Sequence, residues 1–149
     1  MIYLQSMRFG KPAIEGGRPV RQKYLIFGSP LIGREEIDEV VDSLHSGWLS
    51  TGPKVTRFES KIKKYLGANY IKTVNSCTAA MHLSLIAARV GQGDEVITCP
   101  MTFSSTANVI LHVGATPVFV DCEKETGNIN VEKIEEKITK KTKAIMPIH

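Results

Sequence analysis

The sequence changes from a strand pattern to a helix pattern at Val74-Asn75-Ser76-Cys77-Thr78-Ala79-Ala80-Met81. A short run rich in β-branched residues, 70–74, stops at Asn-Ser, and a strongly helical run follows. The first N–H groups of a helix have no internal partner and the helix dipole is positive there, so short Ser, Cys and Thr side chains predict an anchor for a phosphate-bearing ligand. Asn and Ser are also common helix caps, so an ordinary cap is the competing interpretation.

From this point onward, strand and helix patterns alternate. Such alternation with short connections is typical of right-handed βαβ crossovers. We therefore predict an α/β fold of three layers with a mainly parallel central sheet. The helix after Asn75-Ser76 is apolar almost all round, so we expect it to be buried on both sides. The predicted strands are Ile71–Val74, Glu95–Cys99, Pro117–Val120 and Ala144–Ile148, and the predicted helices are Thr78–Val90, Ser104–Val113 and Val131–Thr139.

The preceding residues fall into an arm and two helices. Residues 1–30 have no regular period and contain several Gly and Pro residues, which predicts an irregular N-terminal arm. Amphipathic helices are expected over Arg34–Ser46, stopped by Gly47, and over about 55–66, stopped by Gly67. At the other end, residues 146–149 lie in or just after a predicted strand. We therefore expect residues 31–149 to be the front part of a larger domain.

Composition narrows the class of protein. The 149 residues are 42% hydrophobic and 23% charged, which predicts a folded domain with a core. The net charge of +4 comes largely from amphipathic helices without interleaved aromatic residues, so no nucleic-acid partner is expected. No apolar run approaches the roughly 20 residues of a membrane span. Three cysteines without a C-x-x-C pair indicate neither a disulfide framework nor a zinc site, and favour a reducing, cytoplasmic setting.

Ligands of open α/β sheets bind at the carboxyl ends of the strands. Asn75–Thr78, Pro100–Ser105 and Asp121–Lys124 leave predicted strands at that edge. Phe103 could stack there on a flat heteroaromatic ring, or could be plain core. Cys77 at a helix N-terminus is a conceivable nucleophile, but no His or Asp partner can be named. The histidines lack metal-ligand spacing, and the glycine fingerprints of dinucleotide and P-loop sites are absent, which disfavours an unrelated nucleotide-binding domain.

Four ordered motifs carry a resemblance to a known family. In this order they resemble the DegT/DnrJ/EryC1/StrS family of pyridoxal-phosphate-dependent sugar aminotransferases, over about residues 24–149. The motifs are Gly47-Trp48-Leu49-Ser50-Thr51-Gly52-Pro53-Lys54-Val55 with Phe58-Glu59; Asn75-Ser76-Cys77-Thr78-Ala79-Ala80-Met81-His82-Leu83; Gly93-Asp94-Glu95-Val96-Ile97 with Pro100-Met101-Thr102-Phe103 and Thr106-Ala107-Asn108; and Gly114-Ala115-Thr116-Pro117-Val118-Phe119-Val120-Asp121.

The resemblance implies the N-terminal part of a large domain of pyridoxal-phosphate-dependent transferase fold type I, and a homodimer. It implies transfer of an amino group, usually from glutamate, to a nucleotide-linked keto-sugar in polysaccharide or amino-sugar biosynthesis. By match to the family motifs, Cys77 and Thr78 would hold the phosphate of pyridoxal 5'-phosphate and Phe103 would stack on its ring. The loop around Trp48 and Thr51 would lie near the substrate.

One departure from the family concerns catalysis. The family's cofactor-bearing lysine and the carboxylate that faces the pyridine nitrogen are expected beyond His149, and no lysine of this chain falls in the matching motif. Pyridoxal chemistry needs both groups, so no catalytic residue is assigned and the 149 residues alone are expected to be inactive. The alternative is a non-catalytic binding or scaffold module of the same fold.

Overall fold

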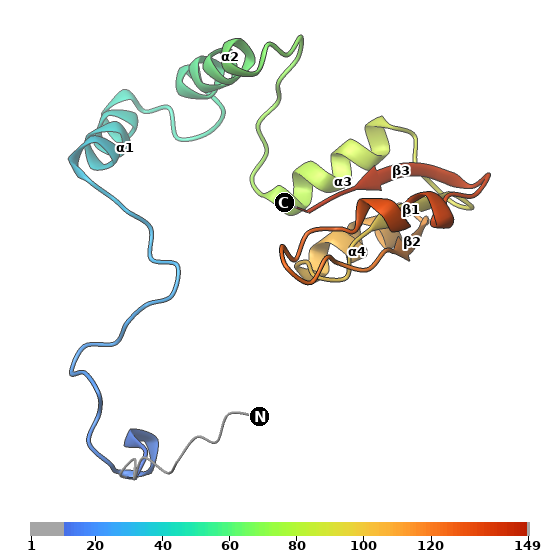
Figure 1. Ribbon diagram of the computed structural model, residues 1–149. Coiled ribbons are helices and arrows are strands. Elements are labelled where there is room, and N and C mark those ends of the chain that lie inside the picture. The colour runs from blue at the N-terminus through green and yellow to red at the C-terminus, as the bar shows by residue number, and fades with distance from the viewer. Residues whose placement is uncertain (1–10, 149) are drawn as a thin grey trace. The chain divides into compact units, whose positions relative to one another are not determined.

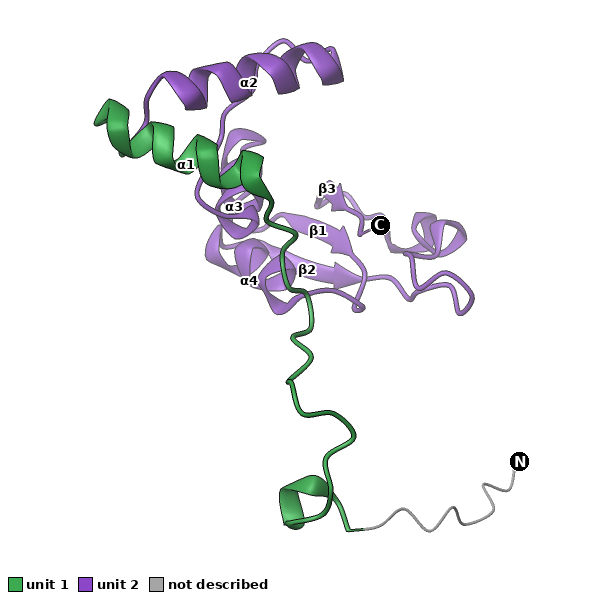
Figure 2. Cartoon of the chain, turned by 90° about the vertical axis from the view of Figure 1, so that its left-hand side faces the viewer, with its two compact units in different colours: residues 1–50 green, residues 51–149 purple. Residues whose placement is uncertain are grey.

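The computed structural model describes residues 11–148, which fall in two compact units, residues 1–50 and 51–149 (Figures 1 and 2). In the first unit, the predicted irregular arm is described from residue 11 and contains one 3-10 turn, Ala13–Glu15; residues 1–10 lie outside the described part. The helix α1, Arg34–Ser46, forms as predicted. The Gly33 N–H donates to the Glu36 carboxylate at its start, and Gly47 ends it in the left-handed conformation, with φ 74°.

The second unit holds one helix followed by an alternation of helices and strands. The helix α2 has a proline at its first position, where the missing N–H costs nothing, and ends at Gly67 with φ 64°. The elements are α2, Pro53–Leu66; α3, Cys77–Ala87; β1, Glu95–Thr98; α4, Ser104–His112; β2, Thr116–Phe119; and β3, Thr142–Met146.

The sheet is parallel and β1 is its central strand. The strand order is β2-β1-β3, with Glu95 opposite both Thr116 of β2 and Thr142 of β3. The helix α4 provides the crossover from β1 to β2. Within β1, the buried Thr98 hydroxyl donates to the Met146 carbonyl oxygen at 2.8 Å, which adds a side-chain hydrogen bond to the β1–β3 ladder.

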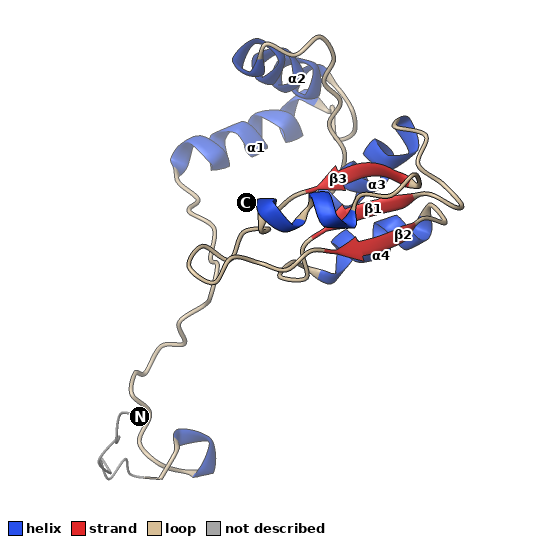
Figure 3. Cartoon of the chain, turned by 45° about the vertical axis from the view of Figure 1, so that its right-hand side comes forward, coloured by secondary structure: helices blue, strands red, loops and turns tan. Residues whose placement is uncertain are grey.

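Helices and turns cover opposite faces of the sheet (Figure 3). Because successive strand residues point to opposite faces, Val96 and Ile97 of β1 enter different cores, and both are fully buried. The first core lies under α3 and α4, and the second lies under the segment 121–138. This arrangement confirms the predicted α/β fold with a parallel sheet. The first core is Leu85, Val90, Val96, Val109, Ile110 and Ala115; the second is Ile97, Cys99, Val120 and Ile129.

The strand predicted over Ile71–Val74 is wrong, because this segment has no strand partner in the described part of the chain. Both sides of β1 are already paired. The Thr73 N–H donates instead to the Glu59 carboxylate of α2, at 3.0 Å. A strand needs a neighbour to receive its hydrogen bonds, so a β-branched run without one remains irregular.

The helix predicted over Val131–Thr139 is also wrong. Two 3-10 turns, Val131–Lys133 and Glu135–Lys137, replace it. The segment is shorter than the roughly 12–15 residues at which an isolated helix becomes marginally stable, and its β-branched apolar residues disfavour helix. Packing of Ile134 against the second core holds the two turns in place.

The helix α3 is buried on one side only, which corrects the expectation that both sides would be covered. Leu85 is buried in the first core, whereas Leu83 and Ile86 are each 51% exposed. One face of this apolar helix packs against α4 and joins Val96 of β1 in the first core through Leu85, whereas Leu83 and Ile86 stay exposed in the described part of the chain. Between residues 11 and 148, no helix combines the length and the apolar character needed to cross a membrane.

The two-core arrangement predicts how neighbouring residues of α4 differ in their contribution to stability. Ile110 is fully buried, whereas Leu111 is 56% exposed. We expect Ile110→Ala to lower the free energy of unfolding by about 2–5 kcal/mol, because it removes buried methylenes and leaves a cavity. Leu111→Ala should change it by at most about 0.5 kcal/mol. Urea denaturation followed by circular dichroism measures both values, and equal losses would contradict the position of Ile110 in the core.

Candidate functional site

At the N-terminus of α3, one residue caps the helix and the backbone N–H groups of the next two residues remain available. The Ser76 hydroxyl oxygen accepts from the Ala79 N–H at 3.1 Å, and the Ser76 carbonyl oxygen accepts from the Ala80 N–H at 3.0 Å. Ser76 is therefore the helix cap, as the competing interpretation required. Within residues 11–148, however, the N–H groups of Cys77 and Thr78 have no protein acceptor. Both residues are exposed, so these N–H groups and the Thr78 hydroxyl can bind an anion at the positive end of the helix.

Phe103 lies at the start of α4 and belongs to neither core. Its side chain is 78% exposed, so the interpretation of Phe103 as plain core is wrong and its aromatic face is available. The adjacent backbone is firmly held: the Phe103 carbonyl oxygen accepts from the Thr106 N–H at 3.0 Å, and the Thr106 and Thr102 hydroxyls are 2.7 Å apart.

The topology brings the N-termini of α3 and α4 to the same end of the sheet. The helix α4 begins after the carboxyl end of β1, whereas α3 leads into the amino end of β1, so α3 also begins at the carboxyl edge. The two helices pack against each other, and the Thr106 hydroxyl contacts the Met81 sulfur at 4.0 Å. The N–H groups of Cys77 and Thr78 and the exposed aromatic ring of Phe103 therefore share one edge of the sheet.

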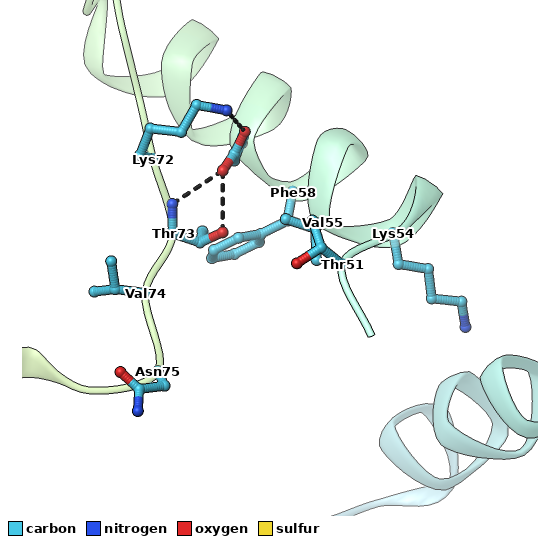
Figure 4. A pocket seen from close by; sticks show the side chains of 9 residues that line it. Thr51, Lys54, Val55, Phe58, Lys72, Thr73, Val74 and Asn75 are labelled. Atoms are coloured by element: carbon cyan, nitrogen blue, oxygen red, sulfur yellow. Dashed lines mark hydrogen bonds and ion pairs between the residues drawn. The ribbon is translucent and has the colours of Figure 1, made fainter. Parts of the chain in front are cut away.

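A pocket of about 650 Å³ lies between α2 and the segment that leads into α3 (Figure 4). Thr51, one of the two residues predicted near a substrate, lines it, and Asn75 connects it along the chain to the cap of α3. The lining residues are Thr51, Lys54, Val55, Phe58, Glu59, Lys72, Thr73, Val74 and Asn75.

Glu59 of α2 forms hydrogen bonds across this pocket to the segment that leads into α3. One carboxylate oxygen accepts from the Thr73 N–H and hydroxyl at 3.0 and 3.1 Å, and the other accepts from the Lys72 ammonium at 3.1 Å (Figure 4). The Thr73 N–H, with the Lys72 ammonium beside it, lowers the pKa of the Glu59 carboxyl from its ordinary value. The sequence motif containing Phe58-Glu59 included this residue, but sequence reasoning gave it no role, because its partners lie 13 and 14 residues away.

Trp48, Thr51 and the Cys77 sulfur are the other side chains that the sequence singled out. Trp48 belongs to the first unit and is 58% exposed, and its backbone N–H donates to the Ser46 hydroxyl at 3.2 Å. Thr51 belongs to the second unit. The substrate role of Trp48 and Thr51 stays a prediction. The Cys77 sulfur has no hydrogen-bond partner among residues 11–148, and the same residues contain no cluster of three metal-ligating side chains.

Comparison with known proteins identifies relatives of this chain. The model of the DegT/DnrJ/EryC1/StrS aminotransferase family matches residues 30–149. The spore coat polysaccharide biosynthesis protein SpsC of Bacillus subtilis is 54% identical over 129 residues, which cover 87% of this chain and 33% of SpsC.

Solved structures show the same likeness. The putative sugar aminotransferase Spr1654 from Streptococcus pneumoniae in its PMP form is 45% identical, with a TM-score of 0.77, over 83% of this chain and 31% of that protein. The PLP form of Spr1654 has a TM-score of 0.76 at the same identity, over 81% of this chain and 31% of that protein. The chain thus spans about a third of the length of these relatives. The family that the sequence motifs predicted is confirmed.

The contacts of Glu59 predict a pH-dependent link between α2 and residues 72–75. Because the pKa of Glu59 is lowered in the folded state, its contribution is present above the ordinary carboxyl range and is lost as the pH falls through the lowered value. We expect the protection of the Thr73 N–H against hydrogen exchange to fall over that acidic range. Glu59→Gln should reduce this protection several-fold at neutral pH, as NMR-detected exchange would measure.

Glu125→Gln is the matched control, because Glu125 is exposed in a hairpin far along the sequence from Thr73. It should leave the protection of the Thr73 N–H unchanged. If Glu59→Gln had no effect either, the carboxylate would not hold this segment.

Proposed function

Because the chain belongs to the DegT/DnrJ/EryC1/StrS aminotransferase family, we propose that it is the N-terminal portion of a pyridoxal-phosphate-dependent sugar aminotransferase. The proposed reaction transfers an amino group from glutamate to a nucleotide-linked keto-sugar, in polysaccharide or amino-sugar biosynthesis. The observation that carries the proposal is the pair of unpartnered N–H groups at Cys77 and Thr78, on the sheet edge where Phe103 is exposed. The names of SpsC and Spr1654 support the biosynthetic setting and the sugar substrate.

The residues at the start of α3 and α4 fit the cofactor pyridoxal 5'-phosphate. A phosphate dianion matches two N–H donors and a hydroxyl at the positive end of a helix of eleven residues. A planar pyridine ring matches the open face of Phe103. When bound, the cofactor supplies the electron sink that amino-group transfer requires. This chain's part is to bind the phosphate at Cys77 and Thr78 and to orient the ring at Phe103.

Thr51 and Trp48 are proposed to contact the substrate, as the family motif implies, and Thr51 lines the pocket of the second unit. The Glu59 carboxylate holds Thr73 in the pocket wall, and through Asn75 this wall continues into the phosphate-binding turn. Glu59 is therefore a positioning residue for the segment that enters α3. We further propose a homodimer in the cytoplasm as the working form of the longer protein.

The proposed phosphate site predicts the effect of two substitutions on cofactor affinity. Thr78→Ala should weaken binding of pyridoxal phosphate by about 1–2 kcal/mol, because one hydrogen bond to a charged oxygen is lost. Phe103→Ala should weaken it by about 1 kcal/mol through loss of the stacking face. Titration followed by the NMR signals of the Cys77 and Thr78 amides measures both.

Ser84→Ala is a matched control on the same helix, since the Ser84 hydroxyl donates to the Ala80 carbonyl oxygen, more than a turn after Thr78. The Ser84→Ala variant should bind pyridoxal phosphate with the same affinity as the unaltered chain. Pyridoxal without its phosphate should leave the two amide signals unmoved. An unchanged affinity in a folded Thr78→Ala protein would remove Thr78 from the site.

The second prediction for this function is that the 149 residues alone do not catalyse transamination. Incubation with pyridoxal phosphate, glutamate and a nucleotide-linked keto-sugar should give no amino sugar, and borohydride should trap no single lysine. Lysines such as Lys61 and Lys140 are exposed, so any reaction of their side chains with the cofactor should be weak and scattered. Stoichiometric modification of one lysine together with turnover would overturn this prediction.

A further inference from the structure

Two cysteines that have no role in the proposed cofactor site lie in contact. The sulfur atoms of Cys99 and Cys122 are 3.3 Å apart. Cys99 directly follows β1 and is fully buried, whereas Cys122 lies three residues after β2 and is half-buried. Since β1 and β2 are parallel neighbours with Thr98 opposite Phe119, both sulfurs lie at the carboxyl edge, on the face covered by the segment 121–138.

The backbone around each cysteine is fixed without help from the pair. Cys99 packs in the second core with Ile97, Val120 and Ile129. Cys122 forms an antiparallel bridge with Ile129 in a hairpin, in which the Asn130 N–H donates to the Asp121 carbonyl oxygen at 2.9 Å. The contact therefore results from the sheet and the hairpin, so the two sulfurs are held together while both are thiols.

The surroundings make the two thiols different. Burial, together with the hydrogen bond to Cys122, raises the pKa of the Cys99 thiol and keeps it protonated at neutral pH. Of these two thiols, only that of Cys122 presents surface to solvent, so a small oxidant that reaches the pair meets Cys122 first. A solvent-accessible thiol beside a second, sheltered thiol is the usual arrangement of an attacked cysteine and a resolving cysteine.

We propose that Cys99 and Cys122 form a peroxide-responsive dithiol that closes to a disulfide. The Cys122 thiolate attacks one oxygen of hydrogen peroxide; an S–O bond forms, the O–O bond breaks and water leaves after protonation. The Cys99 sulfur then attacks the Cys122 sulfur; an S–S bond forms, the S–O bond breaks and a second water leaves. Both sulfurs are oxidised, the peroxide is reduced, and a dithiol reductant reverses the change.

Formation of the Cys99–Cys122 disulfide would alter the loop that leads to Phe103. The Cys99 thiol lies 3.5 Å from the Met101 carbonyl oxygen, to which it donates. A disulfide has no S–H group, so the Met101 carbonyl loses this donor when the bond forms. The oxidised protein should therefore show changed NMR amide signals between Met101 and Phe103, independently of any cofactor.

The test treats the native chain with an equivalent of hydrogen peroxide and then alkylates the remaining thiols. Peptide mapping by mass spectrometry should find a Cys99–Cys122 crosslink and an alkylated Cys77, and dithiothreitol should restore both alkylatable thiols. A crosslink that includes Cys77 would overturn the proposal. Conversion of Cys122 to a sulfinic acid, with Cys99 still reduced, would overturn it as well.

The chain unfolded in urea is the control that shows whether the fold selects the cysteine pair. Cys77 and Cys99 are separated in the sequence by almost the same number of residues as Cys99 and Cys122, so loop closure in urea should favour neither pairing. The Cys99–Cys122 bond should therefore dominate only in the folded protein, and the same mixture in both conditions would refute selection by the fold. Cys77→Ser should keep the crosslink, whereas Cys122→Ser should abolish it and leave Cys99 reduced.

Discussion

The central strand β1 is the constraint on which the rest of the second unit depends. It is hydrogen-bonded to a parallel strand on each side, and from Val96 to Thr98 it is completely buried. Its alternating side chains form parts of two cores, one under the helices and one under the segment that returns from β2 to β3. Even its one buried hydroxyl, that of Thr98, is satisfied by β3.

The polarity of this strand also accounts for where chemistry can occur. Because β1 is parallel to its neighbours, the chain leaves all three strands at one edge, and the helices packed on the sheet begin there. The unpartnered N–H groups of Cys77 and Thr78, the exposed ring of Phe103 and the contact between Cys99 and Cys122 all lie along that edge. The position of the N-terminus of α3 and the contact between Cys99 and Cys122 therefore have a common origin in the parallel arrangement.

Local signals in the sequence predicted most of this architecture. The two glycines at 47 and 67 stop α1 and α2 where expected, and the alternation of apolar runs placed β1, β2, β3 and α4. The cap at Ser76 and the first turn of α3 could be predicted because they are contiguous in the chain, whereas their role as an anion site stays a prediction. The family motifs, which span most of the chain, also predict that Phe103 stacks on a ring; the structure shows that its side chain is exposed, and the stacking role stays a prediction.

The features that sequence reasoning missed depend on distant partners. The run at 71–74 has strand character, but the bond that its Thr73 N–H makes is with α2. Apolar residues all round α3 could not reveal that one side would remain open at Leu83 and Ile86. The contact between Cys99 and Cys122 depends on strand register and a hairpin, neither of which follows from cysteine spacing.

The order β2-β1-β3 has a consequence for how this unit forms on the ribosome. The central strand is synthesised first and both flanking strands follow it, so the sheet can grow outward without inserting a strand between two others. The four consecutive elements α3, β1, α4 and β2 can assemble as near neighbours in the nascent chain. The strand β3 then joins an edge of the sheet that has already formed. Until β3 emerges, the Thr98 hydroxyl lacks its acceptor on Met146, and the open edge of β1 is the surface that a chaperone would have to shield.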